Sequence, residues 1–159
     1  MINLEILLLI FVANGVPVIA SGLLNRRFEV PLDMGVRLPD GQPLFGSSKT
    51  LRGLLLSLPL TAIVAELIGL SFTLGLTVAL WAMLGDLLSS FIKRRLGMAS
   101  GSQALGLDQL FESLLPLLAV AGPLTISATE IMATVITFAV LELLISQILF
   151  RLKLRKHPY

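Results

Sequence analysis

The sequence predicts an all-α, polytopic integral membrane protein with about five transmembrane helices. Composition, the spacing of apolar runs and the placement of basic residues support this fold class. The chain has 159 residues, of which 55% are hydrophobic and only 14% charged, and its mean hydropathy is +0.92. A soluble domain carries about 25% charged residues, so the expected solvent is a lipid bilayer. The length suits a single domain covering residues 1–159.

Five apolar runs have roughly the length of a membrane span, about 20 residues. They cover Ile2–Leu24, Leu51–Leu70, Thr73–Ile92, Leu107–Ala121 and Ala128–Leu149. The fourth run is short and is interrupted by Glu112. The first run has no basic flank before it and is followed by Arg26 and Arg27, so we interpret it as a helix and not as a cleaved signal peptide.

The basic residues set the expected orientation. All 12 Lys and Arg residues fall in two loops and the C-terminal tail: Arg26, Arg27, Arg37, Lys49, Arg52, Lys93, Arg94, Arg95, Arg151, Lys153, Arg155 and Lys156. The other two connections carry none. Because basic loops remain in the cytoplasm, the N-terminus is expected outside and the C-terminus inside. Loops of about 25–50 and 93–107 would then face the cytoplasm from a multi-pass protein of the cytoplasmic membrane.

The residue types present exclude several kinds of site. The chain has no cysteine, and His157 is its single histidine, which excludes Cys-ligated metals, a Ser-His-Asp triad and multi-His metal sites. A metal would therefore need oxygen ligands, as Mg²⁺, Mn²⁺ and Ca²⁺ do. The net charge is only +2, so nucleic acid is not an expected partner.

The first candidate site is a loop rich in glycine and proline that contains Asp33 and ends in the segment Gly46–Gly53. It is not a P-loop, because two serines separate Gly46 from Lys49 and no strand precedes it. Backbone N–H groups at a helix start, together with Lys49 and Arg52, can still bind phosphate. The alternative is an ordinary positive-inside loop.

The second candidate places Asp86, Ser90 and Lys93 on one helix face, at positions i, i+4 and i+7. Asp86 would lie about 10 Å deeper than Lys93 along the helix. An ionised Asp at the centre of a span costs about 2.5–3.5 kcal/mol, so it usually faces a cavity, a partner or an ion. A simple ion pair of Asp86 with Lys93 or an arginine is the alternative.

Two further positions have both a functional and a structural interpretation. Asp108 follows a stretch rich in glycine and serine. It is either a helix N-cap or a second carboxylate opposite Asp86 for Mg²⁺. Asn14, with Gly15 and Pro17, is expected to kink or open the first helix. Its alternative role is a polar contact in the site.

Together these residues form an ordered set. It comprises Asn14, Pro31-x-Asp33-x-Gly35, Asp40-Gly41, Gly46-x-x-Lys49-Thr50-x-Arg52-Gly53, Leu84-Gly85-Asp86, Ser90-Phe-Ile-Lys93-Arg94-Arg95-Leu-Gly97 and Leu107-Asp108-Gln109-Leu. The set resembles the CDP-archaeol synthases, membrane cytidylyltransferases related to the CDP-diacylglycerol synthases. The Ser-Phe-Ile-Lys-Arg-Arg segment and the later Asp-Gln are its most specific part. The last helix departs from the family pattern of His and Asn, since it offers Glu142, Ser146 and Gln147.

The resemblance implies Mg²⁺-dependent transfer of CMP from CTP to a membrane lipid phosphate, which yields a CDP-lipid and pyrophosphate for phospholipid biosynthesis. Asp86 and Asp108 would hold Mg²⁺ and form the catalytic centre with Lys93. The residues implied to bind CTP and lipid phosphate are Asn14, Asp33, Lys49, Thr50, Arg52, Ser90, Lys93, Arg94 and Arg95. The lipid phosphate is already a nucleophile at neutral pH, so the obstacle is charge, which a metal and cations can offset. The departures leave open whether the acceptor is an archaeal diether phosphate or another lipid phosphate.

The alternative function is a small proton- or ion-coupled transporter, which Asp86, Glu66 and Glu142 within spans would support. A transporter places polar groups on a path through the membrane midplane. Here the cations and the carboxylates of Asp33, Asp86 and Asp108 are expected on one side, which favours the enzyme. A structural or interaction protein ranks third, and a homo-oligomer is compatible with each function.

Overall fold

The computed structural model describes residues 3–24 and 27–151. This part of the chain forms five helices and no β-strand: α1 (Leu4–Leu24), α2 (Leu51–Leu67), α3 (Phe72–Arg95), α4 (Leu107–Leu124) and α5 (Ala128–Arg151). The predicted all-α fold with five helices is confirmed. Ile2, Arg26 and the tail residues Lys153, Arg155, Lys156 and His157, which entered the sequence argument, lie outside the described residues.

Helix α2 is shorter than the sequence predicts, ending at Leu67 and not at Leu70. The cause is Gly69, whose φ of 85° turns the chain out of the helix. Its N–H donates to the Glu66 carbonyl (3.0 Å), and the Leu70 N–H donates to the Ala65 carbonyl (2.9 Å). This pair of bonds is a Schellman motif, which satisfies the last helix carbonyls.

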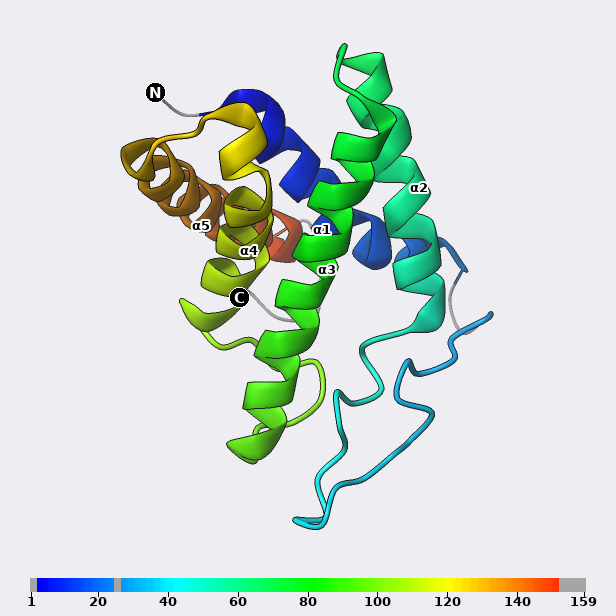
Figure 1. Cartoon of the computed structure of the whole chain (residues 1–159). Coiled ribbons are helices and arrows are strands. Elements are labelled where there is room, and N and C mark those ends of the chain that lie inside the picture. Colours follow the sequence, from blue (N-terminus) through cyan, green and yellow to red (C-terminus); the bar gives the residue numbers. More distant parts are fainter. Residues whose placement is uncertain (1–2, 25–26, 152–159) are drawn as a thin grey trace.

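Four of the helices are long and apolar enough to cross a membrane: α1, α3, α4 and the Ala128–Ile148 part of α5. Helix α2, the fifth predicted span, is not among these four, although it runs between the same two ends of the molecule as α3 (Figure 1). That helix has 17 residues and a length of about 26 Å, against a hydrocarbon core of about 30 Å. Large apolar side chains cover the outer faces of the helices, among them Leu4, Ile19, Leu67, Met132, Ile136 and Ile148.

The loops of the molecule are divided between its two ends (Figure 1). The long irregular segment 27–50 and the connection 96–106 both lie at one end of the helices. The short connections 68–71 and 125–127 lie at the other end. The loops that carry the basic residues therefore meet at one end of the helices, beside the loop ends of α2, α3 and α4.

Helices α1 and α2 pack against each other at Pro17. A proline has no N–H, so the Ala13 carbonyl one turn earlier lacks its usual helical donor. The Ser57 hydroxyl of α2 donates to this carbonyl at 2.8 Å, and Gly53 leaves room for the Pro17 ring. The first helix does not open at Asn14–Pro17, since α1 continues as a helix from Leu4 to Leu24; a kink there stays a prediction.

Helices α3 and α4 touch backbone to backbone at Gly85. A Cβ atom at this position would overlap the Phe111 carbonyl and would lie 3.0 Å from the Glu112 nitrogen. Small residues commonly permit such close approach in membrane proteins, where lipid removes the hydrophobic drive for helix association. The contact fixes Asp86, the next residue of α3, beside the first turns of α4.

We expect Gly85→Ala to destabilise the protein, because the added methyl group must separate α3 from α4. Overpacking of this kind costs about 1–3 kcal/mol. Thermal unfolding in detergent measures the effect as a lowered Tm. The matched control is Gly122→Ala in α4, where a Cβ meets nothing within 4 Å. An unchanged Tm for Gly85→Ala would refute the proposed close contact.

Candidate active site

Two lysine–aspartate ion pairs lie at the loop end of α3. Lys49 Nζ lies 2.5 Å from Asp86 Oδ1, and Lys93 Nζ lies 2.7 Å from Asp108 Oδ1. Asp86 does not pair with Lys93, although the sequence places the two on one helix face. Each residue instead pairs with a partner from another element, so the ion pairs link the first loop, α3 and α4.

These residues line a cavity of about 880 Å³ between the helices and the loops. Its charged lining residues are Lys49, Asp86, Lys93, Arg94, Asp108, Glu112 and Glu142. Apolar residues from α1 and α5, including Phe11, Val18, Phe138 and Ile145, line another part of it. One cavity therefore offers both charged groups and apolar surface, as a substrate with a polar and a lipidic part requires.

Several hydrogen bonds hold the Lys93–Asp108 pair in place. Lys93 Nζ also donates to the Ser102 carbonyl at 2.9 Å, and the Ala104 N–H donates to Asp108 Oδ2 at 2.9 Å. The side chains of Lys93 and Asp108 are only 6% and 7% exposed. Asp108 is not the N-cap of α4, since that position is Gly106. Asp108 therefore does not have the capping role that was the alternative; it forms an ion pair at the cavity.

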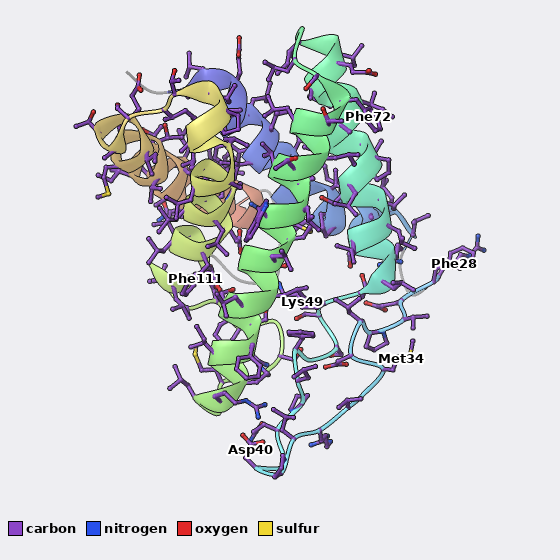
Figure 2. All side chains as sticks on the ribbon, in the orientation of Figure 1. Phe28, Met34, Asp40, Lys49, Phe72 and Phe111 are labelled. Atoms are coloured by element: carbon purple, nitrogen blue, oxygen red, sulfur yellow. The ribbon has the colours of Figure 1, made fainter. Side chains whose placement is uncertain are left out.

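Lys49 reaches the cavity from the end of the first loop and points toward α3 (Figure 2). The next residue, Thr50, is the N-cap of α2, and its hydroxyl accepts the Gly53 N–H at 3.2 Å. Burial by itself would lower the pKa of Lys49. The negative charges of Asp86, Glu112 and Asp108 raise it by more than this, so the pKa lies above its ordinary value. Lys49 is therefore an ammonium at neutral pH.

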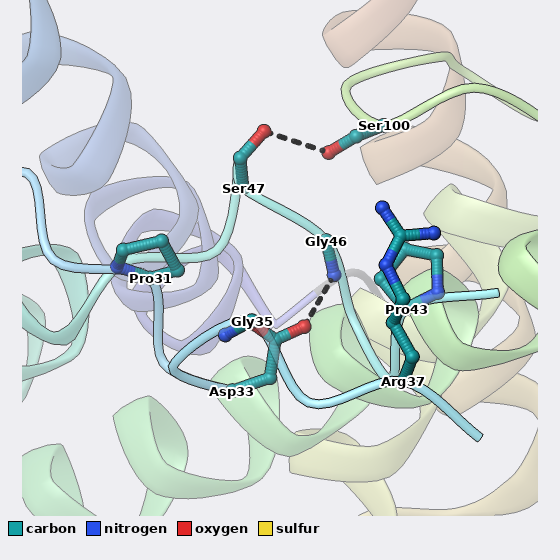
Figure 3. Close-up of a pocket in the computed structure, with 8 residues that line it drawn as sticks. All are labelled: Pro31, Asp33, Gly35, Arg37, Pro43, Gly46, Ser47 and Ser100. Carbon is teal, nitrogen blue, oxygen red and sulfur yellow. Dashed lines mark hydrogen bonds between the residues drawn. The ribbon is translucent and has the colours of Figure 1, made fainter. Parts of the chain in front are cut away.

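Asp33 organises the first loop from within (Figure 3). Its Oδ2 accepts the N–H groups of Phe45 (2.9 Å) and Gly46 (2.8 Å), and its Oδ1 accepts that of Gly35 (3.0 Å). Burial raises the pKa of Asp33, yet these backbone donors lower it below its ordinary value. Asp33 lines a smaller pocket of about 280 Å³ in the loop and does not line the large cavity.

The two loops are fastened to each other outside the cavity. Arg95 Nη1 donates to Asp40 Oδ2 at 2.7 Å, and its Nη2 donates to the Pro43 carbonyl at 2.6 Å. The Ser48 N–H donates to the Ser100 hydroxyl at 3.2 Å, and Figure 3 shows the neighbouring contact of Ser47 with Ser100. These contacts hold the first loop over the end of α3.

The structure brings most of the predicted site residues to one place. Those that line the large cavity are Asn14, Lys49, Thr50, Asp86, Ser90, Lys93, Arg94 and Asp108. Three others lie elsewhere: Asp33 and Arg95 hold the loops, and Arg52 donates to the Arg27 carbonyl. Arg94 is 2% exposed, and its Nε and Nη1 atoms have no hydrogen-bond partner among the described residues.

Sequence reasoning missed several groups of the cavity. Glu112 lines it one helical turn after Asp108 and is 8% exposed. Its signal was a carboxylate within an apolar run, which marks functional sites in membrane helices. Ser102 and Gln103 also line the cavity, and no motif distinguished them from the rest of their loop.

The donor set of the cavity fits one kind of metal site. Asp86 and Asp108 supply carboxylate oxygens, which Mg²⁺ prefers. No group of three or more His, Cys, Asp or Glu side chains is arranged to hold a metal ion in residues 3–24 and 27–151. A Mg²⁺ ion bound here would therefore need further oxygen ligands, and nucleotide phosphates are the usual source in such sites.

This chain is similar in sequence to proteins of one known family. The family model for CDP-archaeol synthase matches residues 1–159. A CDP-archaeol synthase of Sulfurisphaera tokodaii is 34% identical over 155 residues, which cover 93% of this chain and 89% of the relative. That of Saccharolobus solfataricus is 41% identical over 115 residues, which cover 69% of this chain and 66% of the relative.

A solved structure shows the same architecture. It is described as an intramembrane enzyme for archaeal membrane lipid biosynthesis, and it matches this chain with a TM-score of 0.74 and 35% identity. The match covers 87% of this chain and 89% of the solved one. The sequence match over the whole chain and the shared helical architecture lead to one conclusion: the chain belongs to the CDP-archaeol synthase family.

Proposed function

We propose that this chain transfers CMP from CTP to an archaeal ether-lipid phosphate such as archaetidic acid, within the cavity at the loop end of α3. The observation that carries this proposal is the convergence of two aspartates, two lysines and Arg94 on one cavity that also has an apolar wall. Such a cavity suits a reaction between a water-soluble triphosphate and a phosphate carried on a lipid.

The chemistry requires charge neutralisation more than proton transfer. A phosphate oxygen of the lipid attacks the α-phosphorus of CTP, the bond to the β-phosphate oxygen breaks, and pyrophosphate leaves. Both reactants are anions, so cations in a poorly solvated cavity lower the barrier by stabilising the charge that develops. Mg²⁺ held by Asp86 and Asp108 would supply further positive charge to the phosphates.

The cations of the site differ in how free they are to bind phosphate. Arg94 forms no ion pair with another described side chain, and its guanidinium suits bidentate phosphate binding. We assign Arg94, Lys49 and Lys93 to the phosphates. Asp33 and Arg95 act as positioning residues, because their contacts hold the loop that delivers Lys49.

The apolar wall suits the lipid chains. Val18, Ile19 and Ile145 line the cavity and are all exposed. A lipid in the bilayer could contact this part of the wall while its phosphate reaches the charged part. Asn14 lines the cavity from α1, and its amide atoms have no hydrogen-bond partner among the described residues. It is a candidate contact for the polar part of either substrate.

We expect purified protein to transfer the α-phosphate label of CTP to an ether-lipid phosphate, and to release the γ-phosphate label with pyrophosphate. Asp86→Asn and Asp108→Asn should each reduce turnover by about 100-fold or more. Losing a metal carboxylate removes several kcal/mol of transition-state stabilisation, and each 1.36 kcal/mol is tenfold in rate. Label transfer, Mg²⁺ dependence and Tm are measured together for each variant.

The control for these variants is Glu29→Gln, the equivalent loss of charge at a glutamate that is exposed in the first loop and lines neither pocket. It should keep most of the activity, since charges on the exposed surface contribute about 1 kcal/mol or less. Near-normal turnover of Asp86→Asn with unchanged Mg²⁺ dependence would exclude the metal role. Wild-type protein that transfers no label to any lipid phosphate would contradict the proposed function.

We also propose that the loop end of the helices faces the cytoplasm, where CTP is available and where basic loops are retained. The chain has no cysteine, so single introduced thiols report topology directly. On intact cells, a membrane-impermeant maleimide should label Thr73→Cys, beside the short α2–α3 connection, and should spare Val36→Cys in the first loop. The reverse pattern would invert the proposed orientation.

A further inference from the structure

In each ion pair of the cavity, a lysine contacts an aspartate that the proposed function assigns to the metal. Lys49 lies on Asp86, and Lys93 lies on Asp108. In the free protein these two pairs have no net charge. A metal ion can bind either aspartate only by displacing the lysine beside it. A phosphate group can bind either lysine only by displacing the aspartate beside it.

The two pairs are not equally fixed. Lys93 has the Ser102 carbonyl as a second acceptor, and Asp108 accepts the Ala104 N–H in addition. For Lys49 Nζ, Asp86 is the one hydrogen-bond acceptor among the described residues. The side chains of Lys49 and Asp86 are 20% and 17% exposed, against 6% and 7% for the other pair. The Lys49–Asp86 pair is therefore held by fewer contacts and opens toward the cavity more readily.

Binding of one ligand alone would leave a charge without its partner. A divalent cation on Asp86 would displace the Lys49 ammonium from the one carboxylate it is hydrogen-bonded to and would lie close to it. A triphosphate on Lys49 would leave the Asp86 carboxylate unpaired beside another anion. Breaking a buried pair by removing one partner is strongly unfavourable, because the remaining charge is not compensated.

Binding of both ligands together avoids this cost. The cation takes the Asp86 carboxylate, and a phosphate oxygen takes the Lys49 ammonium, so both charges keep an opposite charge beside them. The shortage of protein ligands points the same way, because the described residues hold no cluster of three metal-binding side chains. The nucleotide would have to complete the coordination of the cation.

We propose that Lys49 is a built-in counter-ion of Asp86, so that divalent cation and CTP bind cooperatively and each binds weakly alone. This inference rests on the proposed function of the site. It concerns the free protein, in which Lys49 competes with the cation for Asp86. Its consequence is that removing Lys49 strengthens cation binding in the absence of nucleotide while it weakens nucleotide binding.

The test is equilibrium binding of Mn²⁺, followed by electron paramagnetic resonance, with full-length protein in detergent micelles. CTP should tighten Mn²⁺ binding by about tenfold or more, and Mn²⁺ should tighten CTP binding by the same factor, because such coupling is reciprocal. In Lys49→Met, Mn²⁺ without CTP should bind several-fold more tightly than to wild type. The coupling factor should also shrink in this variant.

Two further variants keep the test decisive. Lys49→Gln retains a hydrogen-bond donor for Asp86, so it replaces Lys49→Met if that variant fails to fold, and it should also bind Mn²⁺ alone more tightly than wild type. Arg37→Met removes one positive charge from an exposed loop residue that does not line the large cavity, and it should bind Mn²⁺ as wild type does.

Two results would overturn the inference: Mn²⁺ affinity of wild type that CTP leaves unchanged, or folded Lys49 variants that bind Mn²⁺ no more tightly than wild type. Label transfer from CTP by the same wild-type preparation separates these failures from a failure of the proposed function. A protein that transfers CMP but shows no coupling would retain its function and lose the counter-ion role of Lys49.

Discussion

The pairing of charge in a poorly solvated cavity is the constraint on which the rest of this structure depends. Lys49, Asp86, Lys93 and Asp108 are all largely buried, and each would be costly without an opposite charge beside it. Their pairing links the first loop to α3 and α3 to α4. The ion pairs thereby fix the loops over the cavity. They also neutralise, in the free protein, the charged groups that would bind a substrate.

The helices meet this constraint through small residues. Gly85 lets α3 approach the backbone of α4, which places Asp86 beside the turn that carries Asp108 and Glu112. On the other side, Gly53 of α2 leaves room for the Pro17 ring of α1, and Ser57 of α2 donates to the Ala13 carbonyl of α1. Lipid gives no hydrophobic drive for these contacts, so close packing and hydrogen bonds must hold the helices together. The polar groups of the cavity and the packing of the helices are therefore parts of one arrangement.

Much of this was predictable from local sequence. Apolar runs located all five helices, and the cost of a carboxylate in a span marked Asp86. The ion-pair partners were not predictable, because Lys49 reaches Asp86 from 37 residues away and helix periodicity relates only near neighbours. Arg95 and Asp33 matched the family pattern as site residues, yet tertiary contacts use them to hold the loops. The early end of α2 depends on Gly69, a position that an apolar run alone does not reveal.

The most direct test of this account is an experimental structure with Mg²⁺ and a CTP analogue that cannot be cleaved at the α-phosphate. We predict that the Lys49–Asp86 pair, at 2.5 Å in the free protein, opens beyond hydrogen-bonding distance, with Lys49 Nζ on a phosphate oxygen and Asp86 on the metal. Lys93 and Asp108, which the Ser102 carbonyl and the Ala104 N–H also hold, should move less than Lys49. A nucleotide bound in the cavity with the Lys49–Asp86 pair still intact would contradict the account.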